Sequence, residues 1–172
     1  MTRKGRFIWF VLVLGALFLI LAFWYKYEYS MDIIEEFEVN SPNYSQKLLI
    51  ATQGSDFKNE VSKGIVNYFE KDSFYIKVID ITKLADIDPA DYNAIVVIHT
   101  WENWQPPADV ELFINRTRNI QNKIIVLTTS GEGSYKMEGI DAITGESKIE
   151  NSSSYINQIT KRLESILNIN SS

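Results

Sequence analysis

The sequence contains no cysteine and one histidine, His99. Without cysteine the chain has no disulfides, thiol nucleophiles, thiolate metal sites or iron–sulfur clusters. A single histidine also excludes a metal site built from several histidines, so we expect no metal. The missing cysteines are compatible with either side of a bacterial membrane and do not choose between them.

Positive charge is also scarce. Seventeen lysines and arginines stand against 22 aspartates and glutamates, which gives a net charge of −5 with no basic stripe. Binding to nucleic acid depends on concentrated positive charge, so we expect no nucleic acid partner.

One long apolar run lies near the N-terminus. Residues 7–24 (FIWFVLVLGALFLILAFW) carry no charge, and as a helix they would be about 27 Å long, close to the roughly 30 Å core of a bilayer. Tryptophans and tyrosines at both ends fit an interfacial aromatic belt. A cleaved signal peptide is the alternative, but no small-residue cleavage site follows. The sequence therefore predicts a cytoplasmic tail and transmembrane anchor within residues 1–26.

The charges on either side of the run predict its orientation. Arg3, Lys4 and Arg6 precede it, whereas residues 27–45 are acidic. Because basic flanks stay in the cytoplasm, we expect a single-pass protein of the cell membrane with a cytoplasmic N-terminus and an extracytoplasmic globular domain. We interpret residues 27–45 as an acidic juxtamembrane stalk.

From residue 46 onwards, runs of strand length alternate with helical patterns. The predicted strands are KLLIAT (47–52), YIKVIDI (75–81), AIVVIHT (94–100), KIIVLTT (123–129) and IDAIT (140–144). Apolar residues at helical spacing follow the first strand, follow Pro107, and return from about residue 153. This alternation predicts a three-layer α/β sandwich over residues 46–172, with a five-stranded parallel sheet of order 2-1-3-4-5.

Ligands of such sheets bind beyond the carboxyl ends of the strands. Here these ends are TQGSD (52–56), HTWENWQPP (99–107) and TSGEGSY (129–135). With these loops the chain resembles the flavodoxin-like superfamily over residues 46–168. More specifically, it resembles poorly characterised membrane-anchored members in which T-W-E-x-W and T-T-S-G-x-G loops recur.

The resemblance implies FMN as a cofactor, and electron transfer to a redox partner protein at the membrane surface. By position, the phosphate would lie against Thr52, Gly54 and Ser55. The flavin ring would lie between the second and third loops, whose candidate residues are Thr100, Trp101, Trp104, Thr129, Ser130, Gly131, Gly133 and Tyr135. No catalytic residue is assigned.

The first loop departs from the flavodoxin pattern T/S-x-T-G-N-T. Two hydroxyls and a glycine remain, but Asp56 stands where a helix begins. A carboxylate there uses the helix N-terminus that a phosphate would need and repels the phosphate. The alternative is a strand–helix turn capped by Ser55 or Asp56.

The segment GIDAITGES (139–147) resembles a second flavin signature, D-x-x-S/T-G-A-S/T, of extracytoplasmic FMN-binding domains. In those domains FMN is esterified to the last hydroxyl, which implies covalent attachment at Ser147. The alternative is that IDAIT is the fifth strand and GES its turn.

Two functions therefore remain open. The first is FMN-dependent electron transfer, and the second is a cofactor-free interaction or small-ligand module on a membrane tether. Trp101 and Trp104 would stack on a flat ring in the first case or pack against protein in the second. His99 is either a ligand of the site or a structural residue. A first loop closed by its own side chains would favour the second function.

Overall fold

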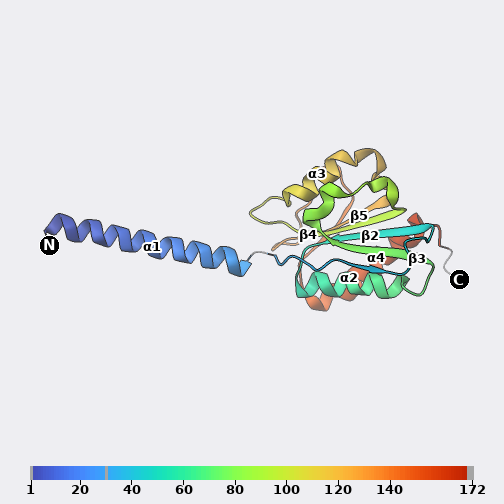
Figure 1. Cartoon of the computed structure of the whole chain (residues 1–172), viewed down its shortest axis with the longest axis horizontal. Helices are drawn as coiled ribbons and strands as arrows, with labels where there is room; N and C mark the ends of the chain where they lie inside the picture. The colour runs from blue at the N-terminus through green and yellow to red at the C-terminus, as the bar shows by residue number, and fades with distance from the viewer. Residues whose placement is uncertain (1, 30, 170–172) are drawn as a thin grey trace. The chain divides into compact units, whose positions relative to one another are not determined.

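The chain forms two compact units in the computed structural model, Met1–Met31 and Asp32–Ser172 (Figure 1). The structure describes residues 2–29 and 31–169, with the backbone alone for residues 25–29.

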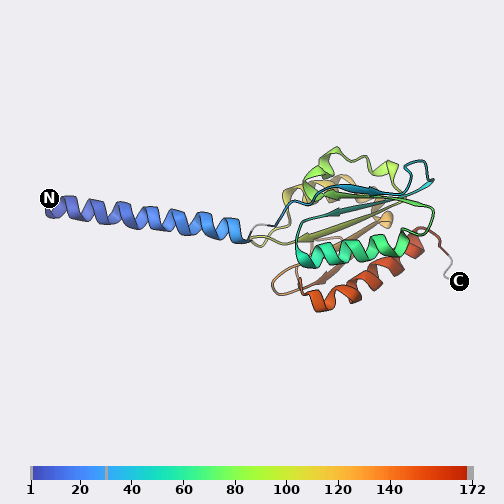
Figure 2. The same cartoon turned by 60° about the horizontal axis from the view of Figure 1, so that its bottom comes forward.

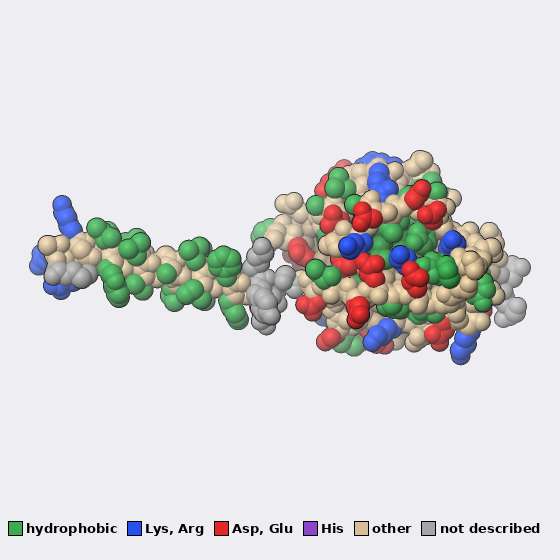
Figure 3. Space-filling model, viewed as in Figure 1, with side chains coloured by type: hydrophobic (Ala, Val, Ile, Leu, Met, Phe, Trp, Pro, Cys, Tyr) green, Lys and Arg blue, Asp and Glu red, His purple; other side chains and the backbone are tan. Residues whose placement is uncertain are grey.

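The first unit is one helix, α1 (Arg3–Tyr29). Its segment Arg3–Trp24 has a mean hydropathy of 2.7 and no buried residues. Beyond the lysine and arginine side chains at its N-terminal end, apolar side chains lie along its visible surface (Figure 3). Its length and composition are those of a membrane-spanning helix, and a signal sequence near an N-terminus has them as well.

The second unit is built on a six-stranded sheet of order β1-β3-β2-β4-β5-β6. The strands are β1 (Phe37–Val39), β2 (Gln46–Thr52), β3 (Phe74–Asp80), β4 (Ala94–Thr100), β5 (Ile124–Thr129) and β6 (Ala142–Gly145). The last five are parallel and have the predicted order, with β2 between β3 and β4. The α/β class and the mostly parallel sheet are therefore confirmed.

The prediction of five strands was wrong because β1 comes from the segment interpreted as a stalk. β1 pairs antiparallel with β3, and Phe37 lies opposite Val78. Glu38 also forms an ion pair with Lys77 at 3.5 Å. Three residues with mostly exposed side chains carry no strand pattern of their own. Only the free edge of β3 makes this segment a strand.

Helices cover both faces of the sheet. The helices of this unit are α2 (Asp56–Phe69), η1 (Ile81–Asp86), η2 (Pro89–Asp91), α3 (Ala108–Arg116), η3 (Arg118–Lys123), η4 (Ile149–Asn151) and α4 (Ser152–Ile166). Helices α2 and α4 lie side by side on one face (Figures 1 and 2). Helix α3 and η1 cover the other.

The alternation of side chains along the buried strands builds the two cores. In β4, Val96 and Ile98 face the α2/α4 core, and Ile95 and Val97 face the α3 core. A parallel strand buried on both faces needs such a continuous apolar run. This architecture places the carboxyl ends of β2, β4, β5 and β6 along one edge of the sheet, which we call the carboxyl edge.

Candidate functional site

The first loop of the carboxyl edge is closed by Gln53, a residue that the sequence analysis did not select. Its side chain is 6 % exposed. Its Oε1 accepts from the Thr100 backbone N–H at 2.7 Å, and its Nε2 donates to Glu102 Oε1 at 2.8 Å. The amide of Gln53 therefore joins the first loop to the second.

The backbone of Asp32 covers the same loop. Gly54 N donates to Asp32 O at 2.6 Å, and Asp32 N donates to Gly54 O at 3.2 Å. A Cβ on Gly54 would lie only 2.7 Å from Asp32 O, so the close approach needs glycine.

We call residues 32–40 the strap. Beyond Asp32, the strap is held by the buried carboxylate of Asp80, whose Oδ2 accepts from Ile34 N at 3.1 Å. It then continues into β1 and ends at Asn40, which has a left-handed φ of 68°. No signal in the sequence distinguishes these contacts from an extended stalk.

The predicted phosphate residues are engaged with the protein itself. Thr52 is fully buried, and its hydroxyl donates to Gln53 O at 3.0 Å. Ser55 is the N-cap of α2, and its Oγ accepts from Lys58 N at 3.3 Å. The alternative of a capped strand–helix turn therefore describes this loop.

Lys58 lies buried beneath the first loop, with its Nζ 3.5 Å from Ser55 Oγ. Burial lowers the pKa of Lys58 to about 8, and the carboxylate of Glu102 opposes part of that shift. The sequence signal for this lysine is its place beside Phe57 at the start of an amphipathic helix.

A chain of hydroxyls joins the ends of three neighbouring strands. Thr100 Oγ1 lies 2.7 Å from Thr129 Oγ1, to which Ser147 Oγ donates at 2.8 Å. The neighbouring Ser130 is 5 % exposed, and its Oγ has no partner among the described residues. This edge thus gathers the predicted hydroxyls of the second and third loops.

His99 ends β4 as a buried residue. Its Nε2 lies 3.0 Å from Thr128 Oγ1, and its Nδ1 has no partner in the part of the chain that the structure describes. Burial lowers the pKa of His99 to about 4, and the positive charge of Lys58 adds to the shift. A neutral, buried imidazole supports the structural interpretation of this residue.

The aromatic rings of Trp101 and Tyr135 lie at the same edge and contact each other. Their centroids are 5.4 Å apart, with 33° between the ring planes. The buried Trp101 Nε1 has no hydrogen-bond partner within residues 2–29 and 31–169. The two residues therefore lie at the same edge, as the sequence predicted. Their rings contact each other and do not enclose a space for a third ring.

Trp104 does not join this pair. It lies at the tip of a tight turn in which Glu102 and Gln105 exchange backbone hydrogen bonds of 2.9 and 3.0 Å. Asn103 (φ 50°) and Trp104 (φ 61°) are both left-handed, the conformation of a type I′ turn. The indole of Trp104 is 79 % exposed.

The third loop uses one of its two predicted glycines for backbone geometry. Gly133 has a φ of +66°, and its N–H donates to Ser130 O at 3.1 Å. A Cβ on Gly131 would meet nothing within 4 Å. Gly131 therefore has no steric requirement in this conformation.

The segment 139–147 forms β6 and the turn after it. Gly145 ends β6, and a Cβ there would lie 1.6 Å from the Tyr155 hydroxyl. The packing of Tyr155 against the backbone thus accounts for the glycine of the D-x-x-T-G-E-S segment without a flavin.

FMN does not fit the carboxyl edge in this conformation. Its phosphate would compete with Asp32 for Gly54 N and meet the carboxylate of Asp56. A flat ring between two others needs centroids about 7 Å apart, twice the carbon contact distance of about 3.5 Å. The 5.4 Å between Trp101 and Tyr135 leaves no such slot.

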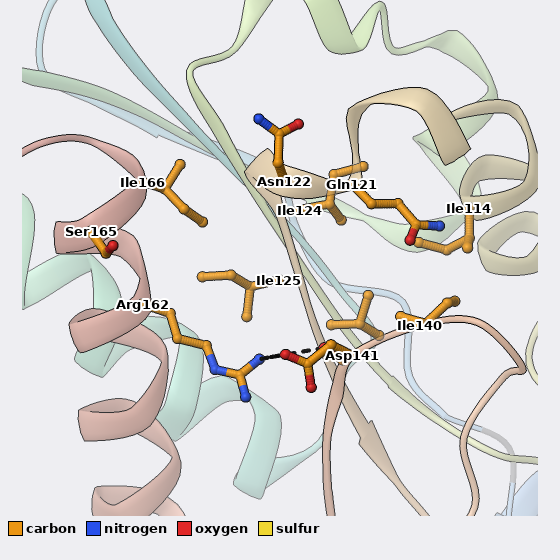
Figure 4. Close-up of a pocket in the computed structure, with 11 residues that line it drawn as sticks. Ile114, Gln121, Asn122, Ile124, Ile125, Ile140, Asp141, Arg162, Ser165 and Ile166 are labelled. Carbon is orange, nitrogen blue, oxygen red and sulfur yellow. Dashed lines mark hydrogen bonds and ion pairs between the residues drawn. The ribbon is translucent and has the colours of Figure 1, made fainter.

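A cavity of about 540 Å³ lies away from this edge, between β5 and α4. Isoleucines line much of it, and Arg162 forms an ion pair with Asp141 across one side at 3.3 Å (Figure 4). None of the candidate FMN residues of the three loops lines it, but Asp141 of the 139–147 segment does. Among the described residues, no group of three or more acidic or histidine side chains is arranged to hold a metal.

Comparison with solved structures finds flavodoxins. A flavodoxin from the domain Archaea is 14 % identical with a TM-score of 0.49, over 71 % of this chain and 99 % of that chain. Oxidised flavodoxin 2 from Bacillus cereus is 14 % identical with a TM-score of 0.45, over 69 % and 98 %. A mutant flavo di-iron protein from Thermotoga maritima is 14 % identical with a TM-score of 0.46, over 72 % and 37 %.

No family model matches the sequence, and no curated protein matches it. Because these TM-scores are below 0.5, the fold is assigned from the strand order and not from these likenesses. The order of the five parallel strands, 2-1-3-4-5 when counted from β2, is that of flavodoxin-like sheets. The globular unit of this chain has a flavodoxin-like fold.

Proposed function

We propose that this chain is a membrane-tethered binding module with a flavodoxin-like fold, whose own residues take the place of the FMN phosphate. The apolar helix α1 would be its anchor, with a cytoplasmic N-terminus and the globular unit outside. The observation that carries the proposal is the reciprocal backbone pairing of Asp32 with Gly54. Fold alone does not establish function, so the proposal rests on this loop.

The contacts around this pairing support a stable closure. Gln53 adds two hydrogen bonds between the first and second loops, and Asp80 holds the strap from the end of β3. Opening the first loop for a phosphate would break contacts to a buried amide, which is costly without replacement partners.

The absorbance of the purified full-length chain near 450 nm tests this proposal. We expect a colourless protein that also leaves the fluorescence of added FMN unchanged, with a known flavodoxin as the positive control. A yellow preparation, or saturable quenching of FMN, would contradict it. A reporter fused to the C-terminus tests the side of the membrane on which the globular unit lies.

A second candidate is FMN-dependent electron transfer with a redox partner. Lys58 favours it, because a buried cation 3.5 Å from Ser55 Oγ places positive charge beside the first loop. Thr52, Gly54 and Ser55 would then hold the phosphate, after the strap had moved away. In that case the preparation is yellow, and colour that stays with the denatured chain would indicate attachment at Ser147.

A further inference from the structure

Trp104 has the largest exposed fraction among the large hydrophobic residues that the structure describes, at 79 %, with Ile33 next at 77 %. Of the four tryptophans, Trp9 and Trp24 belong to the apolar helix, and Trp101 packs against Tyr135. An exposed indole contributes little to the core of the unit that carries it. The packing of the core therefore does not explain why a tryptophan stands at this position, and a contact outside the folded unit would.

Several contacts constrain the turn that carries Trp104. Reciprocal backbone hydrogen bonds close it, the side chain of Glu102 is held by Gln53, and Pro106 and Pro107 follow directly. The second central position of such a turn favours glycine, because φ is positive there. Here a tryptophan occupies it at φ 61°. A rigid aromatic side chain raised on a preorganised turn is typical of an interface hot spot.

The loops around this turn are acidic. The segments that follow β2, β4, β5 and β6 place six carboxylates around this edge, and Asp32 of the strap adds a seventh, against two lysines, Lys136 and Lys148: the six are Asp56, Glu102, Glu132, Glu138, Glu146 and Glu150. Lys148 is itself paired with Glu146. A negative rim attracts a basic surface and is repelled by anionic lipid.

A cavity of about 430 Å³ opens next to the turn. Half of its lining residues are apolar, among them Trp101, Pro106 and Met137, and half are polar or charged, among them Arg118, Lys136 and Glu138. A partner side chain with an apolar stem and a polar end can be received there while Trp104 enters the partner. The projecting side chain of Trp104 and the cavity that could receive a partner's side chain thus lie within a few residues of each other.

We infer that the Glu102–Gln105 turn is the docking point for a partner protein with a basic surface, and that Trp104 is buried on docking. The inference names the partner class of the binding module proposed above and rests on that function. Charge complementarity favours a basic protein over the membrane surface as the occupant.

Photo-crosslinking of the full-length chain in its native membranes tests this. Benzoylphenylalanine replaces Gln105, next to the intact Trp104, and a control chain carries it at Leu112, which is 66 % exposed on α3. We expect one discrete protein adduct from position 105 and none from 112. Mass spectrometry then identifies the captured protein, whose surface is expected to be basic.

Variants separate docking from chance capture. Trp104→Gly, which the turn accommodates, should abolish the adduct. The pair Glu132→Gln and Glu138→Gln should lower its yield about tenfold, and so should raising the salt from about 0.05 M to about 0.5 M. The matched pair Glu60→Gln, on the exposed side of α2, and Glu70→Gln, at the exposed C-cap of that helix, should leave it unchanged.

The inference is wrong if position 105 gives no adduct, gives the same adduct as 112, reacts with lipid, or gives an adduct that is insensitive to Trp104→Gly or to salt. The absorbance spectrum of the same preparation judges the proposed function separately. A yellow chain with a Trp104-dependent adduct refutes the closed cofactor loop and keeps the docking surface. A colourless chain without an adduct keeps the closed cofactor loop and refutes the docking surface.

Discussion

Asp32 and Gly54 exchange two backbone hydrogen bonds, of 2.6 and 3.2 Å, at the carboxyl edge of the sheet. The first is the N–H of the loop glycine donating to the first residue of the globular unit. The resemblance to flavodoxins predicted that the N–H groups of this loop would point toward a phosphate. The pairing therefore explains both why the strap is folded and why the first loop is closed.

Replacing the glycine of this pair should loosen the strap. In Gly54→Ala the added Cβ would lie 2.7 Å from Asp32 O, and backbone cannot give way as a flexible side chain does. We expect the free energy of unfolding in urea to fall by about 1–3 kcal/mol, and proteases to cleave within residues 32–40. Gly131→Ala is the control, because nothing lies within 4 Å of its Cβ. Equal stability of the two variants would contradict the close approach.

Removing the amide of Gln53 should destabilise the carboxyl edge. Gln53→Ala leaves the Thr100 N–H and the Glu102 carboxylate without the bonds of 2.7 and 2.8 Å that they make now. Unpaired buried groups cost about 1–3 kcal/mol in unfolding free energy, measured in urea. Gln158→Ala, at an exposed position of α4, should change it by less than about 0.5 kcal/mol. A loss at Gln53 no larger than this control would show that the loops are not joined there.

His99 should make the folded unit sensitive to acid. Its pKa is about 4 in the folded state against 6.5 for an ordinary histidine, so the unfolded chain binds the proton first. The free energy of unfolding therefore falls as the pH drops from 6.5 to 4, by up to about 3 kcal/mol from this residue. His99→Gln lacks this titration and should show a shallower decline in urea unfolding across that range. Parallel pH curves for the two proteins would contradict the buried, neutral imidazole.

Trp104 should be dispensable for folding. A left-handed backbone at a residue other than glycine lowers the free energy of unfolding by about 1–2 kcal/mol, and a glycine at position 104 would remove this strain. Glycine also gains conformational freedom in the unfolded chain, which cancels about 0.5–1 kcal/mol of that gain in stability. Trp104→Gly should therefore unfold at an equal or slightly higher urea concentration. Asn103→Gly should change stability less, because asparagine tolerates this conformation. A loss above about 1 kcal/mol in Trp104→Gly would mean that the indole packs within the folded unit.

The local patterns of the sequence predicted the elements of the globular unit well. AIVVIHT and KIIVLTT became β4 and β5 because such runs are stable only when both faces are buried. Ser55, one of the two predicted caps, is the N-cap of α2 because its hydroxyl is near the first free N–H groups of the helix. The alternation of elements then predicted the order of the parallel strands and brought Trp101 and Tyr135 to one edge.

The contacts between distant segments could not be predicted. β1 has too few apolar residues to be a strand by itself, and it exists because β3 offers an unpaired edge. Gln53 looked like an ordinary turn residue, since its partners Thr100 and Glu102 are almost fifty positions away. Lys58 carried no mark of burial beyond its apolar neighbours.

By itself the sequence determined the apolar helix, the acidic charge, the α/β class and the edge of the sheet at which the candidate loops meet, because each follows from local pattern and strand direction. The tertiary structure alone decided whether that edge is open. Asp32 closes the first loop, Trp101 meets Tyr135, and Trp104 faces solvent. Each of these depends on how segments far apart in the chain pack together. The pattern of apolar residues within one segment does not predict such contacts.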